Sequence, residues 1–261
     1  MAKASTREAN KLLRILLVGY SGSGKTGSLI SLLRAGYTIR MLDMDYNVES
    51  LIQLCKREDP KLLDNLDVIS LRDKFRASQT AGVEVAGQPK AFVEMLKLMN
   101  KWDDGSTPGA WPRDNIFVVD TLSSIGRAAF HWAKGMNPST KDGRQWYAAA
   151  GEAIKSFLEM ITSPDFNNHV IVLSHIDLVD MPDQSVQGFA SSLGKALGPQ
   201  IPKTFSTMLM AEKKGSGSNT RRTIQTAPTS LIDLKNPMPW SLEKELPLDT
   251  GMATVFEKLL S

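Results

Sequence analysis

The sequence is poor in the residues that covalent and metal-stabilised folds require. Its 261 residues include one cysteine, Cys55, so no internal disulfide can form. The three histidines, His131, His169 and His175, are scattered along the chain, and no Cys/His cluster has the spacing of a zinc site. These absences exclude a disulfide scaffold and a zinc-stabilised domain.

Long apolar runs and a strong charge of one sign are also absent. The first apolar run, residues 12–18, is short and contains Arg14, so it is neither a signal-peptide core nor a membrane span. The net charge is +3, which permits a nucleic-acid partner without favouring one. Hydrophobic residues make up 42% of the chain, as in ordinary globular proteins, and a cytoplasmic location is the default expectation.

Apolar runs alternate with amphipathic stretches through the first two thirds of the chain. Uniformly apolar runs bounded by polar residues predict buried strands, and apolar stripes at a spacing of three to four residues predict helices. The predicted strands are 12–18, 38–42, 66–71, 116–119 and 170–173. The predicted helices are 26–34, 48–56, a helix opened by Pro89 with apolar positions from 92 to 102, 122–134 and 144–161. This alternation predicts an α/β fold with a mostly parallel sheet.

Two polar stretches are predicted as loops, and the pattern becomes β-rich after residue 175. Residues 72–88 are predicted to be a mobile loop, and residues 177–200 a long functional or disordered loop. Residues 207–213 and 221–226 flank GSGSN and predict a β-hairpin, followed by a further strand at 231–235. We expect a flexible N-terminus over 1–11 and one α/β domain over 12–261 with a C-terminal β-hairpin extension.

The octet GYSGSGKT at residues 19–26 matches the Walker A pattern G-x-x-x-x-G-K-[ST] between a predicted strand and a predicted helix. Its backbone N–H groups and the N-terminus of the following helix would face the phosphates of ATP. Lys25 would reach the β- and γ-phosphates, and the hydroxyl of Thr26 would face Mg²⁺. The alternative is a flexible turn that contains a lysine. The predicted nucleotide-binding residues are Gly19, Ser21, Gly22, Ser23, Gly24, Lys25 and Thr26.

The segment NIFVVD ends a predicted strand in Asp120, the Walker B form, and this carboxylate would hold Mg²⁺. Alternatively, Asp120 or Thr121 would only cap the helix that follows. Because Thr121 stands where many ATPases carry a glutamate, a group that activates water must come from another strand. Asp43 and Asp45, after the second strand, are candidates unless they form a solvent-facing acidic turn.

His175 ends the fifth predicted strand in VIVLSHID. A polar side chain at the carboxyl end of a central parallel strand lies in the crevice where ligands bind. His175 would therefore contact the γ-phosphate and signal its presence to the following loop. The alternative is a structural histidine with satisfied hydrogen bonds.

Together these stretches resemble phage-encoded RecA-like P-loop ATPases, the AAA-type phage nucleotide-binding proteins, some of which act in single-strand annealing or recombination. The resemblance spans residues 12–261. It implies a RecA-like core, ATP and Mg²⁺ as cofactors, a homo-oligomer with nucleotide at subunit interfaces, and a location in the host cytoplasm. It rests on GYSGSGKT, MLDMDYNVESL, IFVVDTLSSI and VIVLSHID, and downstream on LGKALGPQIPKTFSTMLMAE and LIDLKNPMP.

The resemblance also assigns roles to single residues. The family usually has a glutamate where this chain has Asp45, so it implies Asp45 as the group that activates water and makes hydrolysis slow or partner-dependent. By its position in LIDLKNP, Lys235 would reach the nucleotide of an adjacent subunit, or else it is a surface lysine. Lys25, Asp45, His175 and Lys235 form the predicted catalytic set.

Two segments are candidates for contact with single-stranded DNA. The stretch 177–200 matches by position the DNA-facing loop of RecA-like proteins, and it contains Lys195. The predicted hairpin carries clustered basic residues, which phosphate contacts require. The alternative is a solvated hairpin tip, and no aromatic residue there offers base stacking. The hairpin's basic residues are Lys213, Lys214, Arg221 and Arg222.

Three functions fit the sequence. The first is a DNA-dependent RecA-like ATPase in recombination, annealing or replication. The second is a small-molecule or nucleotide kinase, although no arginine-rich lid follows the core. The third is a nucleotide-dependent scaffold or assembly factor with little hydrolysis. ATPase assays with and without single-stranded DNA separate the three.

Overall fold

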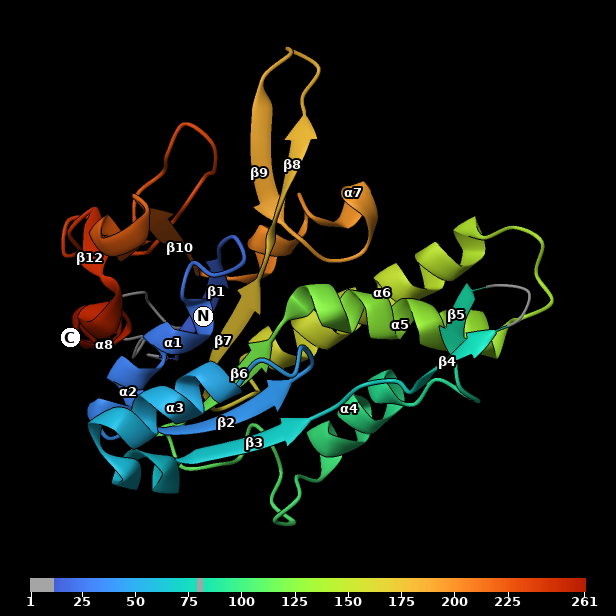
Figure 1. Ribbon diagram of the computed structural model, residues 1–261, viewed down its shortest axis with the longest axis horizontal. Helices are drawn as coiled ribbons and strands as arrows, with labels where there is room; N and C mark the ends of the chain where they lie inside the picture. The colour runs from blue at the N-terminus through green and yellow to red at the C-terminus, as the bar shows by residue number, and fades with distance from the viewer. Residues whose placement is uncertain (1–11, 79–81) are drawn as a thin grey trace, which may run out of the picture.

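The computed structural model describes residues 12–78 and 82–261, and the expected flexible segment 1–11 lies outside these ranges. Its centre is an eight-stranded sheet of order β12-β11-β10-β1-β7-β6-β2-β3 (Figure 1). The strands from β3 to β10 in that order are parallel to one another. Strand β11 is antiparallel to β10, and β12 is antiparallel to β11. The sheet strands are β1 (Arg14–Val18), β2 (Thr38–Asp43), β3 (Leu66–Ser70), β6 (Asn115–Asp120), β7 (His169–Ser174), β10 (Thr207–Lys214), β11 (Arg221–Gln225) and β12 (Glu245–Pro247).

Both faces of the sheet are buried because runs within its central strands, such as Ile15–Val18 and Ile116–Val119, are apolar at every position. Along β1, Ile15 and Leu17 belong to the core on one face, and Leu16 and Val18 belong to the core on the other. Successive side chains of a strand point to opposite faces, so an uninterrupted apolar run needs cover on both sides. The expected α/β fold with a mostly parallel sheet is confirmed.

Helices supply that cover in two layers (Figure 1). The core that contains Leu16 holds buried side chains of α4 (Ala91–Asn100), α5 (Leu122–Met136) and α6 (Arg144–Thr162). The core that contains Ile15 holds side chains of α2, α3 and α8, together with Leu29 between α1 and α2. Their bounds are α1 (Lys25–Ser28), α2 (Ile30–Arg34), α3 (Glu49–Glu58) and α8 (Leu248–Leu260).

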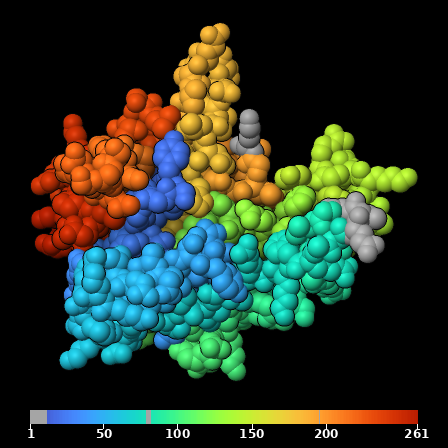
Figure 2. All heavy atoms as spheres, in the orientation of Figure 1, coloured from blue at the N-terminus to red at the C-terminus, as the bar shows by residue number. Residues whose placement is uncertain are grey.

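The two stretches predicted as loops contain strands. Within 72–88, β4 (Phe75–Ser78) pairs antiparallel with β5 (Gly82–Val85). Within 177–200, β8 (Ile176–Asp180) pairs with β9 (Val186–Ala190), and the short helix α7 (Gly194–Leu197) follows. The β8–β9 hairpin projects from the body of the protein (Figures 1 and 2). The prediction of loops was therefore wrong for β4, β5, β8, β9 and α7, and in the four strands local pairing satisfies the backbone.

The C-terminal third differs from the prediction in two more elements. The hairpin β10–β11 forms as predicted, but residues 231–235 contribute only one bridge, between Met208 and Lys235. The edge strand is instead β12, and α8 packs against α1 and α2. Three short 3₁₀ helices complete the described chain: η2 (Pro60–Asn65), η3 (Ile201–Thr204) and η4 (Gly217–Asn219). None of the helices in the described ranges combines the length and apolarity needed to cross a membrane.

Candidate nucleotide-binding site

The octet forms the connection between β1 and α1 at the carboxyl edge of the parallel sheet. The N–H of Gly19 donates to the carbonyl of Ser174 at 3.1 Å, which fixes the loop's start against β7. Gly22 and Gly24 have φ angles of 73° and 100°, in the left-handed region that favours glycine. A Cβ on Gly24 would lie 2.5 Å from Cδ2 of Leu248, so a side chain here would displace that of Leu248. The sequence motif therefore has a structural basis in turn geometry and close packing.

The side chain of Lys25 is buried and points back into the loop. Its Nζ donates to the carbonyl oxygens of Gly19 at 2.8 Å and Tyr20 at 3.2 Å. Burial lowers the pKa of Lys25, and the nearby charges of Asp120 and Asp45 oppose that shift. A desolvated ammonium held by neutral carbonyls is suited to bind a more negative partner, such as a phosphate.

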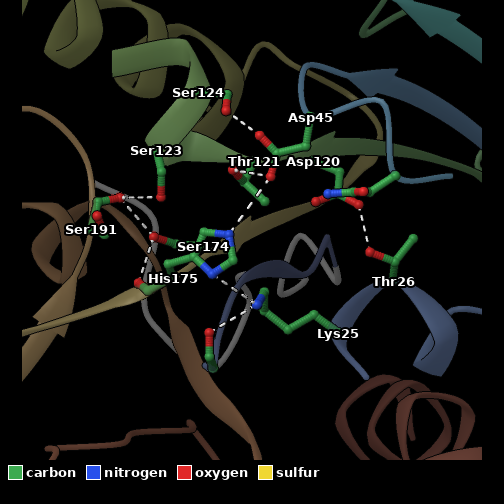
Figure 3. A network of polar contacts seen from close by, with 12 residues as sticks. Lys25, Thr26, Asp45, Asp120, Thr121, Ser123, Ser124, Ser174, His175 and Ser191 are labelled. Atoms are coloured by element: carbon green, nitrogen blue, oxygen red, sulfur yellow. Dashed lines mark hydrogen bonds and ion pairs between the residues drawn. The ribbon is translucent and has the colours of Figure 1, made fainter. Parts of the chain in front are cut away.

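Thr26 and Asp120 are brought together from two elements. The hydroxyl of Thr26 donates to Oδ2 of Asp120 at 2.6 Å (Figure 3). Asp120 is 1% exposed, and burial raises its pKa to about 6, helped by the charges of Asp45 and Asp43. Its carboxylate makes no capping hydrogen bond to α5, whose N-cap position is Thr121. The helix-cap alternative for Asp120 is therefore not what the structure shows.

Asp43 and Asp45 have different surroundings. Asp43 is fully buried and accepts hydrogen bonds from the backbone N–H groups of Asp45 and Asn47 at 3.2 Å and of Val48 at 3.4 Å. Its carboxylate thus holds the turn that follows β2. Asp45 instead points toward α5, where Oδ2 accepts from Thr121 at 3.1 Å. Of the two candidates, Asp45 is the one that faces the site.

Asp45 is also held by two further groups. The hydroxyl of Ser124 donates to its Oδ1, and Nε2 of His175 lies 3.7 Å from its Oδ2. Burial alone would raise the pKa of Asp45, but interactions with His175, Ser124 and Thr121 outweigh burial and lower it. Asp45 is therefore a carboxylate at neutral pH, fixed by two hydroxyls and one imidazole.

His175 lies between Lys25 and Asp45 (Figure 3). Its Nδ1 is 3.4 Å from Nζ of Lys25, and its Nε2 faces Asp45. An ammonium can only donate, so Nδ1 must accept and the ring hydrogen lies on Nε2. Beside the ring, Ser174 Oγ donates to the carbonyl of Ser191 at 2.8 Å and links this corner to the base of the β8–β9 hairpin. His175 is thus connected to the P-loop, to Asp45 and to the hairpin.

A cavity of about 770 Å³ opens beside these groups. Ser21, Gly22, Gly24, Lys25, Thr26, Asp45, Asp120 and His175 all line it. Its remaining wall includes the apolar side chains of Ile30, Leu54 and Leu248. Gly19 and Ser23 do not line the cavity but pack against each other within the loop. A Cβ on Gly19 would lie 2.5 Å from Oγ of Ser23. The hydroxyl of Ser23 is buried without a hydrogen-bond partner among the described residues.

The predicted basic tip divides over two faces of the β10–β11 hairpin. Lys214 pairs with Glu245 at 2.7 Å and Glu212 at 3.2 Å, and Arg221 pairs with Glu245 at 3.2 Å. On the other face, Nε of Arg222 donates to the carbonyl of Gly22 at 3.1 Å, so this residue lines the nucleotide cavity. The predicted compact cluster of four free cations is therefore not formed.

Lys203 and Lys235 are not among the residues that line the cavity. Lys195 is in α7, and its side chain is outside the described part of the structure. Lys203 is in η3, and Lys235 is exposed and bridges to Met208 through its backbone. The stretch predicted to face DNA was 177–200. Its first part belongs to the β8–β9 hairpin (176–190), which has three aspartates and neither lysine nor arginine.

Sequence reasoning missed three residues of this site: Thr121, Ser124 and Arg222. The serine and threonine follow Asp120 in DTLSS, and hydroxyls directly after a Walker B aspartate at a helix start were an available signal. Arg222 reaches the P-loop only because β11 lies two strands from β1 in the sheet. No local pattern predicts that contact.

A comparison with protein families identifies the family of this chain. A family model described as an AAA domain matches residues 11–238, which is most of the chain, and the chain belongs to this family. This places it in the P-loop ATPase class that the octet predicts. A comparison with proteins of curated function finds no match.

Similar solved structures include three proteins of low identity. A KaiC-like protein from Pyrococcus horikoshii OT3 has 10% identity and a TM-score of 0.41, with 81% of this chain and 76% of that chain covered. The flagellar accessory protein FlaH from Methanocaldococcus jannaschii has 12% identity, a TM-score of 0.43, and coverage of 90% and 84%. The RadB recombinase has 14% identity, a TM-score of 0.42, and coverage of 85% and 91%. At these scores the resemblances are too distant to bear on activity or partner.

Proposed function

We propose that this protein binds ATP with Mg²⁺ in the cavity beside the P-loop and hydrolyses it. The observation that carries the proposal is the 2.6 Å contact between Thr26 and Asp120. These residues are separated by 94 positions in the chain, yet the fold places a hydroxyl and a carboxylate together beside the buried ammonium of Lys25. That combination is what a magnesium nucleotide needs from a P-loop.

The donor set fits Mg²⁺. The metal prefers oxygen ligands and usually takes one or two from protein, the rest coming from water and phosphate. Within residues 12–78 and 82–261, no three His, Cys, Asp or Glu side chains gather as a complete metal site. Thr26 and Asp120 would thus hold the ion together with phosphate. When bound, Mg²⁺ supplies positive charge to the phosphate oxygens during transfer.

The remaining residues have separate tasks in this proposal. Lys25 exchanges the carbonyls of Gly19 and Tyr20 for the β- and γ-phosphate oxygens. Asp45 orients the attacking water, since its lowered pKa makes it a weak proton acceptor but a fixed, charged hydrogen-bond acceptor. His175 contacts both Asp45 and Lys25 and would keep the two side chains in fixed relative positions. A change in their positions would reach the β8–β9 hairpin through the backbone of His175.

The same geometry predicts slow turnover without a partner. Thr121 and Ser124 both donate to Asp45, so its lone pairs are partly occupied. A shift of α5 or of His175 could break one of the hydrogen bonds to Asp45. The freed carboxylate oxygen could then accept a hydrogen bond from the attacking water. If nothing frees Asp45, the protein is a nucleotide-dependent scaffold with little hydrolysis, which is the second candidate.

We further propose that the partner is single-stranded DNA, in recombination, annealing or replication, and that the protein works as a homo-oligomer. This follows the resemblance to phage RecA-like ATPases. In such an assembly Lys235, which is exposed, is free to reach the nucleotide of a neighbouring subunit. A phage origin, with the protein in the host cytoplasm, is part of the same proposal.

Phosphate release from Mg·ATP, measured with and without single-stranded DNA, tests the proposal. We expect slow release by the protein alone and a rise of at least about tenfold with DNA. Binding of a fluorescent ATP analogue without any hydrolysis, in both conditions, would favour the scaffold. Absence of ATP binding would contradict the proposed function altogether.

A further inference from the structure

A second cavity, of about 280 Å³, lies on the other side of Asp45 and His175. Both residues line it as well as the nucleotide cavity. Its other walls come from the chain after β3, from β4 and from α5. The volume is at the low end of ligand pockets, so it suits a fragment such as one nucleotide unit rather than a whole cofactor.

The two carboxylates of this cavity already have partners. Asp73 accepts from the backbone N–H groups of Lys90 at 2.8 Å and Ala91 at 2.9 Å, at the start of α4. Its other oxygen lies 3.1 Å from Nδ1 of His131. Asp45 is held by Thr121 and Ser124, as described above. Neither carboxylate therefore requires a cation from the cavity.

The two guanidinium groups of the cavity have no such partner. Arg72 and Arg127 are exposed, and neither side chain has an ion pair or a hydrogen bond to another group within residues 12–78 and 82–261. They enter the cavity from separate elements, the segment after β3 and helix α5. Because the two carboxylates accept their hydrogen bonds from other groups, both guanidiniums keep their N–H donors available, and a phosphate could accept from the two together.

An aromatic ring stands beside these charges. Phe75, on β4, lines the cavity and is 43% exposed. Its ring meets that of His131 edge-on, with centroids 5.6 Å apart, so His131 fixes its position. An exposed ring next to arginines offers a base a stacking surface and its phosphate an ionic partner. The cluster of Arg72, Arg127 and Phe75 is called the arginine pocket below.

We propose that the arginine pocket binds one nucleotide unit of single-stranded DNA, with the phosphate on Arg72 and Arg127 and the base against Phe75. This rests on the proposed DNA partner and moves its contact away from the β8–β9 hairpin, whose three aspartates would repel a phosphate backbone. Because Asp45 and His175 form the wall between the two cavities, DNA in one is sensed directly by the water-orienting group of the other.

Fluorescence anisotropy of a labelled oligothymidylate with the full-length protein, at several salt concentrations, tests this site. We expect Arg72→Ala/Arg127→Ala to weaken binding at least about tenfold and to flatten the salt slope by about 1.4 units, the share of two phosphate contacts on a single strand. Phe75→Ala weakens binding while leaving the salt slope unchanged, because stacking releases no counterions. Lys213→Ala/Lys214→Ala, which removes two cations of the β10–β11 hairpin, is the matched control and changes binding less than twofold.

The possible outcomes separate the site from the function. Suppose that the wild type binds DNA, and that Arg72→Ala/Arg127→Ala has a normal circular dichroism spectrum and the same affinity for DNA. This result overturns the arginine pocket and leaves the DNA partner in place. No DNA binding by the wild type at low salt overturns the DNA partner and the pocket with it. Inorganic phosphate and unlabelled DNA are also compared as competitors at the same ionic strength and the same concentration of phosphate groups. If both displace the labelled oligonucleotide equally well, the site takes free phosphate and the polynucleotide assignment is wrong.

Discussion

Nζ of Lys25 lies 3.4 Å from Nδ1 of His175, although 150 residues separate them in the chain. The contact joins the P-loop to the end of β7 through the two groups that would meet the terminal phosphate. When Lys25 turns to a phosphate, His175 loses one neighbour while it keeps Asp45. In the proposed mechanism, this contact and the one from His175 to Asp45 would connect phosphate binding to the carboxylate proposed to orient water.

Lys25→Ala tests the phosphate role of the buried ammonium. We expect the affinity for a fluorescent ATP analogue to fall roughly 100-fold, since charged hydrogen bonds in a desolvated site contribute about 1.5–3 kcal/mol each. Lys213→Ala is the control, because that lysine is exposed on the hairpin and lies outside the cavity. Equal affinity of the two variants for the analogue would remove the Walker A assignment.

Asp120→Asn tests the metal role of the buried carboxylate. The amide keeps the shape of the side chain and still accepts from Thr26, but it lacks the charge that holds Mg²⁺. We expect turnover to fall by at least about 100-fold while metal-free nucleotide binding persists. A Mg²⁺ titration of phosphate release measures this, and full activity of the variant at every concentration would make Asp120 structural.

Asp120 also predicts a pH dependence of stability. Its pKa rises from 3.8 to about 6 on folding, so the folded protein binds this proton more tightly than the unfolded chain does. Its stabilising contribution is complete below about pH 4 and is lost as the pH rises through 6. We therefore expect the difference in unfolding free energy between wild type and Asp120→Asn to shift against the wild type between pH 4 and 7. Urea unfolding across that range measures it, and a pH-independent difference would show that Asp120 is not buried as described.

Asp45 and Asp43 form a matched pair for separating catalysis from structure. Asp45→Asn should bind ATP normally and hydrolyse it at less than about a tenth of the wild-type rate, while its stability stays close to wild type. Asp43→Ala should instead lose about 1–3 kcal/mol of stability, because three backbone N–H groups lose their acceptor. Single-turnover hydrolysis and urea unfolding of both variants give the comparison. Wild-type hydrolysis by Asp45→Asn would move the water-activating role elsewhere.

The central sheet was predictable because its strands are buried on both faces. Runs such as Ile116–Val119 are apolar at every position, and the octet sits between one such strand and a helix, which places the P-loop. The apolar spacing of Met252, Val255, Phe256 and Leu259 in α8 was an available signal that the prediction did not use. The edge strand β12 has three residues, too few for any periodic pattern.

The side chains around Asp45 were less predictable, since they depend on which elements meet. By residue pattern alone Asp43 and Asp45 are equal candidates; the family resemblance favours Asp45, and the direction of the turn after β2 explains why Asp45 and not Asp43 faces the cavity. Similarly, Arg222 looks like a hairpin-tip cation in the sequence, and its contact with Gly22 comes from the order of strands in the sheet. Polar stretches such as 177–200 were misassigned because strand pairing within a hairpin does not require an apolar run.

Gly22 and Gly24 provide a test of the loop that does not depend on catalysis. Both have positive φ angles, so an alanine at either position costs about 1–2 kcal/mol of backbone strain. A Cβ at position 22 has nothing within 4 Å, whereas a Cβ at position 24 lies 2.5 Å from Leu248 and 3.1 Å from Cδ of Arg222. We therefore expect Gly24→Ala to lose at least about 1 kcal/mol more than Gly22→Ala, through overpacking against α8 and β11. Urea unfolding of the nucleotide-free variants measures the difference. If Gly24→Ala is no less stable than Gly22→Ala, the C-terminal helix does not pack on the P-loop in solution, and this wall of the nucleotide cavity has to be redrawn.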